Sequence, residues 1–429
     1  MTIKSIKIEN LFGIFSYNIS FKKNSNILII TGPNGFGKTK VLNIIDNLFN
    51  RRFIYFKQLS FKKIIVTLED NVQITIDKPE SDEPIFHFFE HNKLIETIKK
   101  SSDFDFEKSI QEYLPIRKIS DSIWIDTMSN ETYGSKGDLI DYYIDKLPDE
   151  ISSNMYVVKS ERSIEIIDSI NVHLIKEQRL WTKARKSDRM RDKSISNIMV
   201  GTIETYSKEL KQRISELTKK SYTQSQELDS SYPKRLIHEK NILNKLEYEA
   251  RYKTLTLKQD KLKKFGLYEG KQEFLEYSIS DAKALSVYLK DSELKLEVFD
   301  DLLNKLELFS DILNHRRFTF KTIQIDNLKG FYFKTVNDLD LELKQLSSGE
   351  QHEVVLLYEL IFNLKDDVLI LIDEPEISLH ITWQKDFLND LIKILGRNDI
   401  QVIIATHSPS IINDRWDLVH NLEPINFSK

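Results

Sequence analysis

Apolar residues recur with two different periods along this chain. Near the N-terminus Ile6 and Ile8 flank a lysine, which is the alternation of a half-buried strand. The continuous apolar run at 27–30 is typical of a buried strand, and 41–49 follows with the spacing of a helix. The chain therefore opens with an α/β layer.

A hairpin follows this opening. Two strand-like runs, 64–68 and 72–76, flank the turn residues 69–71, which predicts an antiparallel pair. Residues 80–155 are acidic and weakly periodic, and the tract from Asp103 to Glu107 is typical of an exposed insertion. A further strand-like run occupies 170–175.

The pattern becomes helical from about 183 to 315. Pro and Gly nearly vanish there, while apolar residues such as Leu210 and Ile214 keep the helical period. The heptads are too irregular to predict one extended coiled coil. Pro233 and Gly266 are expected to mark turns between helices.

Strand patterns return after Arg317, at 318–325, 330–333 and 339–343. The runs Val368 to Ile372 and Val402 to Ala405 are continuously apolar, as in buried parallel strands.

The predicted fold is therefore an α/β P-loop head built from N- and C-terminal parts around a long helical, coiled-coil-like insertion. Its expected divisions are residues 1–182, the insertion 183–315 and residues 316–429.

Composition narrows the class of protein. The 429 residues include 62 basic and 66 acidic ones, so no overall field would attract nucleic acid or a membrane. There is no cysteine, which excludes disulfides and thiolate metal sites. The N-terminus lacks a signal-peptide pattern, and no apolar run approaches the roughly 18 residues of a membrane helix. A soluble, cytoplasmic protein is expected.

The stretch TGPNGFGKT lies between the first buried strand and the first helix. Its spacing is that of a P-loop, whose backbone N–H groups wrap a phosphate chain while the lysine and hydroxyl reach terminal phosphates and magnesium. An ordinary Gly-rich turn is the alternative, and the strand and helix on either side disfavour it. The predicted ATP-binding residues here are Gly32, Pro33, Asn34, Gly35, Gly37, Lys38 and Thr39.

Two carboxylates, Asp373 and Glu374, end the apolar run 368–372. An aspartate at the carboxyl end of a parallel strand beside a P-loop can hold magnesium together with Thr39, and the next glutamate can activate the attacking water. The alternative is a solvated pair at a strand end, which the coexisting P-loop makes less attractive.

A third motif, LSSGEQ, opens the helical run that begins near residue 348. Ser347, Ser348 and Gly349 offer free N–H groups and the positive end of a helix dipole to an anion. An N-cap with nothing bound explains the motif equally well on local grounds.

The order of these motifs, followed by Ala405-Thr406-His407-Ser408, resembles the ABC-type ATPase heads of the SMC, RecF and RecN kind. The resemblance implies that Ser347 and Gly349 reach the γ-phosphate of a nucleotide held by another copy. It also implies that His407 is a switch histidine, which senses the γ-phosphate. Without the resemblance, a single histidine after a strand would be interpreted as structural.

The sequence departs from the common pattern at two positions. Ser348 stands where the signature has glycine, and His380 stands where transporters carry an aspartate, which fits the RecF-like and OLD-like branch. Gln58 could be a Q-loop glutamine that ligates magnesium, although a surface glutamine is the simpler reading.

The segments LSSGEQHEVVLLYEL, LIDEPEISLHITWQ, ATHSPSIINDRWDL and LDSSYPKRL resemble ATPases of bacterial antiphage systems, above all the AriA type of PARIS and then the PtuA type of Septu. This implies a homo-oligomer of head-to-head dimers, with a hexamer as the larger option, that senses a phage protein or nucleic acid. No nuclease motif is found, nor room for a Toprim domain after Trp416, so a separately encoded Toprim-type or HNH-type nuclease is the expected partner.

Two other functions stay open. A DNA-repair or DNA-bridging ATPase would use a basic patch, for which the run from Lys183 to Lys193 is the candidate. A solvated helix face is the preferred reading of that run. A nucleotide-gated module that hardly hydrolyses is disfavoured by Glu374 and the signature together, although slow turnover would suit a scaffold.

Overall fold

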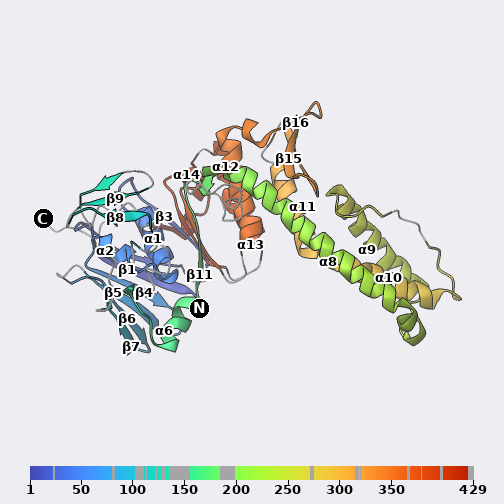
Figure 1. Ribbon diagram of the computed structural model, residues 1–429, viewed down its shortest axis with the longest axis horizontal. Helices are drawn as coiled ribbons and strands as arrows, with labels where there is room; N and C mark the ends of the chain where they lie inside the picture. The colour runs from blue at the N-terminus through green and yellow to red at the C-terminus, as the bar shows by residue number, and fades with distance from the viewer. Residues whose placement is uncertain are drawn as a thin grey trace.

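The computed structural model shows an elongated molecule with strands at one end and a long helical arm at the other (Figure 1). The structure describes residues 1–22, 25–79, 83–101, 111, 114–120, 123–127, 131–134, 155–183, 199–270, 275–314, 318, 320–364, 368–377, 379–396 and 400–423.

A five-stranded parallel sheet organises the head, in the order β11-β17-β18-β3-β19. Its strands are β3 (Ile27–Thr31), β11 (Asn171–Ile175), β17 (Val368–Asp373), β18 (Val402–Ala405) and β19 (Val419–Asn421). This sheet combines two strands from the N-terminal part, β3 and β11, with three from the C-terminal part, so neither part could form it alone. Both predicted apolar runs of the C-terminal part are confirmed as buried parallel strands.

A six-stranded antiparallel sheet, in the order β2-β1-β4-β5-β6-β7, lies beside it (Figure 1). Its strands are β1 (Ile3–Leu11), β2 (Phe15–Ser20), β4 (Lys63–Leu68), β5 (Val72–Asp77), β6 (Ile85–Glu90) and β7 (Lys93–Ile98). The predicted β4–β5 hairpin is confirmed, with Asp70 and Asn71 both in the left-handed region at φ 54° and 55°.

The region 80–155 therefore contributes β6 and β7 to this sheet. It also forms a small antiparallel sheet of β8 (Ile116–Lys118), β9 (Trp124–Asp126) and β10 (Thr132–Tyr133). The tract from Asp103 to Glu107 lies outside the described residues.

Side chains from the two faces of the parallel sheet enter different cores. One face packs with the antiparallel sheet and with α1 (Lys38–Phe49), α2 (Tyr55–Gln58) and α6 (Glu161–Asp168). The other face packs with α12 (Ser348–Tyr358) and α13 (Ile381–Leu395). Burial on both sides explains why these strands are continuously apolar.

The helical arm consists of α8 (Thr202–His238), α9 (Lys245–Lys264), α10 (Ala282–Glu297) and α11 (Asp300–Ile312). A two-stranded ribbon of β12 (Trp181–Lys183) and β13 (Met199–Gly201) leads into it. Gly266 turns the chain after α9 with φ 65°, as predicted.

The prediction of a turn at Pro233 is wrong, because α8 continues through this residue to His238. Pro233 lies in the second-last turn of the helix. Because proline has no N–H, one helical hydrogen bond is missing there, and only the few residues after it need other contacts to stay helical. Arg235, just beyond it, donates to the carbonyl oxygen of Leu228 and forms an ion pair with Asp291 of α10. Packing against α10 therefore holds this last stretch helical.

The arm shares a core with the C-terminal part of the head. The four arm helices α8, α9, α10 and α11 contribute side chains to this core. So do α12 and the sheet of β14 (Lys321–Asp326), β15 (Gly330–Thr335) and β16 (Asp340–Leu341). The predicted strand 339–343 is shorter than expected, because a 3₁₀ turn, Leu343–Gln345, begins at its last residue. None of the helices in the described ranges combines the length and apolar character needed to cross a membrane.

Candidate functional site

The P-loop joins the end of β3 to the start of α1 and is held by the antiparallel sheet. Gly37 has φ 84°, and a Cβ on it would lie 3.2 Å from Cδ2 of Leu11. The Tyr17 hydroxyl of β2 donates to the carbonyl oxygen of Phe36 at 2.7 Å, and the Phe36 ring packs on Phe15 with 5.2 Å between centroids. The loop is therefore shaped by packing as well as by its own glycines.

The neighbouring parallel strands β17, β18 and β3 place the predicted site residues at the carboxyl-terminal ends of the strands, on one edge of the sheet. Nζ of Lys38 donates to the carbonyl oxygen of Gly32 at 3.0 Å and lies 3.4 Å from Oε1 of Glu374. The Thr39 hydroxyl donates to Oδ1 of Asp373 at 3.0 Å. Residues more than 330 positions apart in sequence thus meet, and the predicted pairing of P-loop and strand-end carboxylates is present in the geometry.

The Asp373 carboxyl is suited to a cation. Burial raises its pKa to about 6, with Glu177 and Glu376 nearby adding to the rise and the Thr39 hydroxyl and Lys38 opposing it. A hydroxyl and a carboxylate oxygen side by side are the hard donors that Mg²⁺ prefers. Thr39 and Asp373 therefore fit a magnesium ion in the chemistry of their donor atoms.

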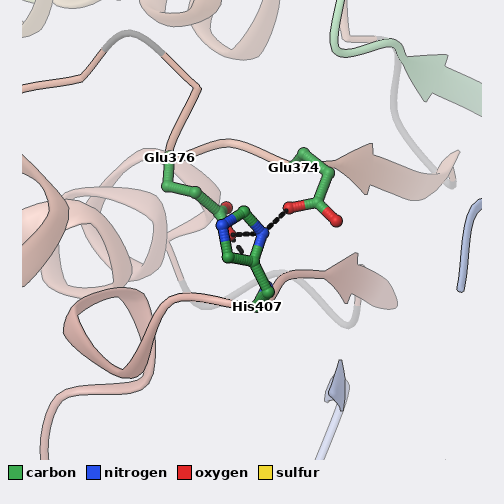
Figure 2. A group of neighbouring side chains, drawn as sticks. All are labelled: Glu374, Glu376 and His407. Carbon is green, nitrogen blue, oxygen red and sulfur yellow. Dashed lines mark hydrogen bonds and ion pairs between the residues drawn. The ribbon is translucent and has the colours of Figure 1, made fainter. Parts of the chain in front are cut away.

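Glu374, Glu376 and His407 form a cluster beside this pair (Figure 2). Nδ1 of His407 lies 2.5 Å from Oε2 of Glu374 and 3.1 Å from Oε1 of Glu376. Glu374 adopts a left-handed φ of 43°, and its N–H donates to the carbonyl oxygen of Ala405 at 2.9 Å. This hydrogen bond ties the residue after β17 to the end of β18 and sets the direction of the Glu374 side chain.

A cavity of about 440 Å³ opens over these groups. Predicted residues that line it are Asn34, Gly35, Gly37, Lys38, Thr39, Glu374 and His407. Its other lining residues are Phe12, Lys40, Glu177 and Ile377. The cavity therefore joins the phosphate-binding loop to the carboxylate proposed to activate water.

Sequence reasoning missed Phe12, Glu177 and Glu376. Phe12 lies in the turn after β1 with a left-handed φ of 56°, is 39% exposed and lines the cavity together with residues of the P-loop. An aromatic residue in a turn between two predicted strands was the available signal. Glu376 was visible as a third acidic residue after a buried strand, but its buried position depends on tertiary packing.

The signature turn lies elsewhere. Ser347 caps α12 in a capping box with Glu350, whose carboxylate is held by Lys321 Nζ at 2.7 Å. Ser347 and Ser348 are exposed, and neither they nor Gly349 line the cavity over the P-loop of the same chain. A role for these three residues in nucleotide binding therefore requires another copy and stays a prediction.

Gln58, His380 and the candidate DNA patch lie away from the cavity or outside the described residues. Gln58 is the last residue of α2, is partly buried and does not line the cavity, so its role as a magnesium ligand stays a prediction. His380 caps α13 through Nδ1 at 3.4 Å from the N–H of Thr382. The candidate DNA patch runs from Lys183 to Lys193. Lys183 is the last residue of β12, and residues 184–193 lie outside the described residues.

A parallel sheet that carries a P-loop, a strand-end Asp-Glu pair and a histidine after the adjacent strand has the arrangement of a P-loop ATPase head. The family model described as "AAA ATPase domain" matches residues 1–412, and the chain belongs to this family.

The comparisons also include weaker similarities. The chain is 30% identical over 109 residues to Protein ea59 of Escherichia phage lambda, a match that covers 24% of this chain and only 21% of that protein. An SMC head domain from Thermotoga maritima aligns over 99% of this chain and 96% of its own, at 12% identity and a TM-score of 0.38. A Pyrococcus furiosus Smc head with an extended coiled coil, bound to the C-terminal domain of ScpA, aligns over 99% and 94% at 13% identity and 0.38.

Proposed function

We propose that this chain hydrolyses ATP with magnesium at composite sites between copies, and that it is a sensor and scaffold controlling a separate nuclease in antiphage defence by abortive infection. The observation that carries the ATPase part is that Lys38, Thr39 and Glu374 line one cavity, while the Thr39 hydroxyl donates to the Asp373 carboxylate.

Each residue has a distinct task in this proposal. Lys38 and the N–H groups of the loop bind the phosphates, and Thr39 with Asp373 would hold magnesium, which when bound neutralises phosphate charge. Glu374 orients and deprotonates the attacking water, since its carboxylate borders the cavity. His407 lines the same cavity and senses the terminal phosphate through its exposed ring, which is 52% accessible.

The composite site follows from the exposed signature turn. Ser347, Ser348 and Gly349 present the N-terminus of α12 to solvent while the P-loop cavity of the same chain lacks them. A second copy facing the first would place this turn over the phosphates. Head-to-head dimers, or a hexamer of such dimers, are the assemblies proposed, with slow turnover.

The defence role is supported by the antiphage-type sequence segments around the signature and after β17. Within the described residues, the acidic and histidine group that could hold a metal ion is Glu374, Glu376 and His407, which belongs to the ATP site. Cleavage of nucleic acid is therefore assigned to a Toprim-type or HNH-type partner, and the trigger to a phage protein or nucleic acid.

Two substitutions test the ATPase site. Glu374→Gln should retain ATP while turnover falls by about 10²-fold or more, because the amide cannot accept the proton from water. Lys38→Ala should lose both ATP binding and defence. Nucleotide affinity, phosphate release and protection of phage-infected cells are the measurements.

Lys7→Ala provides the control, because Lys7 is an exposed lysine of β1 paired with Glu9 at 2.8 Å. It should behave as wild type. Normal hydrolysis by the Lys38→Ala protein would contradict the site assignment.

A further inference from the structure

The loop that carries His407 is fastened by a single carboxylate oxygen. Oε1 of Glu376 accepts hydrogen bonds from the Thr406 hydroxyl at 2.5 Å, the His407 N–H at 2.8 Å and the Ser408 N–H at 3.0 Å. The Glu376 side chain is buried, and Thr406 is fully buried. These contacts fix the backbone on both sides of a histidine whose own ring is half exposed.

The same carboxylate also limits where the His407 ring can go. Nδ1 of His407 lies 3.1 Å from Oε1 of Glu376 and 2.5 Å from Oε2 of Glu374 (Figure 2). The ring is therefore held between two acidic groups from the segment that follows β17. Removing Glu376 would free the loop while leaving the hydrogen bond between Thr39 and Asp373 in place.

The buried guanidinium of Arg179 interacts electrostatically with Glu376. Arg179, only 7% exposed, donates through Nη2 to the carbonyl oxygen of Pro375 at 3.1 Å. Among the residues that the structure describes, its Nε and Nη1 have no hydrogen-bond partner, and neither does Oε2 of Glu376. Burial lowers the pKa of Arg179 to about 10, an effect that the carboxylates of Glu353 and Glu376 oppose. Arg179 thus offsets the charge of a carboxylate that would be costly to bury alone.

We propose that Glu376 is a positioning residue for hydrolysis, which fixes the backbone of residues 406–408 so that the His407 imidazole meets the Glu374 carboxylate at the nucleotide cavity. This inference rests on the proposed ATP hydrolysis. Glu376 does not line the cavity, so it acts through His407 and Glu374 rather than on the nucleotide.

The test separates turnover from binding. Glu376→Ala should lower kcat by about 10- to 100-fold, because a small displacement of a catalytic group has an effect of that order. Its affinity for ATP should stay within about threefold of wild type, since binding that is uniform along the reaction does not change. Glu376→Gln should retain most of the turnover, because an amide oxygen accepts the same hydrogen bonds from the loop.

A double variant distinguishes positioning from general destabilisation. Glu376→Ala combined with His407→Ala should be no slower than His407→Ala alone, because both changes remove one interaction. The control is Gln401→Ala, which removes a buried side chain just before β18 that hydrogen-bonds the backbone of Ile3 in β1 at 2.7 and 2.9 Å. It should lower the melting temperature and leave kcat unchanged.

Three results would overturn the inference: wild-type kcat in Glu376→Ala, fully additive losses in the double variant, or an equal loss of kcat in Gln401→Ala. If Glu376→Ala does not fold, Thr406→Val takes its place, because it removes one donor to Oε1 at nearly constant volume, and it should lower kcat with ATP affinity unchanged. A wild-type protein that neither binds nor hydrolyses ATP would contradict the proposed function. An active wild type with an unaffected Glu376→Ala would contradict only the positioning role.

Discussion

At the scale of single residues, His352 of α12 illustrates how the ATPase head holds charges in its interior. The side chain is buried, and its Nδ1 has no hydrogen-bond partner within the described part of the chain. Burial, together with the nearby Arg179, lowers the pKa of His352 to about 4. The folded protein therefore keeps this imidazole neutral in a region where protonation would place two cations together.

This predicts that acid destabilises the protein through His352. In the unfolded chain the imidazole takes up a proton near pH 6.5, whereas in the folded chain it does so only near pH 4, so stability falls as pH drops between these values. His352→Leu should lose less stability than wild type between pH 7.5 and pH 5. Thermal unfolding at both pH values measures this, and an equal loss in the two proteins would show that another group is responsible.

At the scale of elements, the junction of α8 with α12 connects the arm to the signature turn. Arg213 of α8 donates to the carbonyl oxygen of Phe362 at 2.6 Å and to Oδ1 of Asn363 at 2.8 Å, at the end of the π-helical turn (Glu359–Asn363) that follows α12. The rings of Tyr206 and Tyr358 stack with 4.5 Å between centroids. The first turns of the arm and the signature helix therefore behave as one unit.

Arg213→Ala should destabilise this unit by about 1–2 kcal/mol, because it removes charge-assisted hydrogen bonds at the end of a helix. Arg251→Ala is the matched control. Arg251 is similarly exposed, at 41% against 35%, but pairs with Glu293 within the arm, and its removal should cost less than about 1 kcal/mol. Denaturant unfolding of both variants is the measurement, and equal losses would contradict a special role for the junction.

At the scale of the whole molecule, the two halves of the proposed ATP site belong to different cores. The P-loop helix α1 packs with the antiparallel sheet, whereas α12 and its signature turn pack mainly with the arm and with β14 and β15. Figure 1 shows α1 and α12 on different sides of the parallel sheet. A composite site would therefore join the P-loop of one copy to the arm-linked core of another.

Mixing two inactive variants tests this arrangement. Lys38→Ala removes the P-loop lysine, and Ser348→Arg blocks the exposed signature turn while leaving the Ser347 cap in place. If sites form between copies, an equal mixture should recover about a quarter of wild-type turnover, because half of the dimers then contain one intact site of two. Recovery should need subunit exchange, and a mixture that stays inactive after co-expression would contradict the composite site.

Local sequence determined much of the chemistry. The spacing from Gly32 to Thr39 predicts a phosphate-binding turn, and the apolar run before Asp373 predicts a buried strand that ends at a carboxylate. These patterns depend on neighbours within a few residues, so they could be read without the fold. The turn at Asp70 and Asn71 was predictable for the same reason.

Only the tertiary structure decided which distant residues meet. The pairing of Thr39 with Asp373, the fastening of residues 406–408 by Glu376 and the burial of Arg179 all depend on strand order and on packing across the sheet. Pro233 stays inside α8 because contacts with α10 outweigh its local preference. Backbone preferences and short motifs are local, whereas burial and long-range hydrogen bonds are set by segments hundreds of residues apart, so the sequence determined the parts of the site and the fold determined their arrangement.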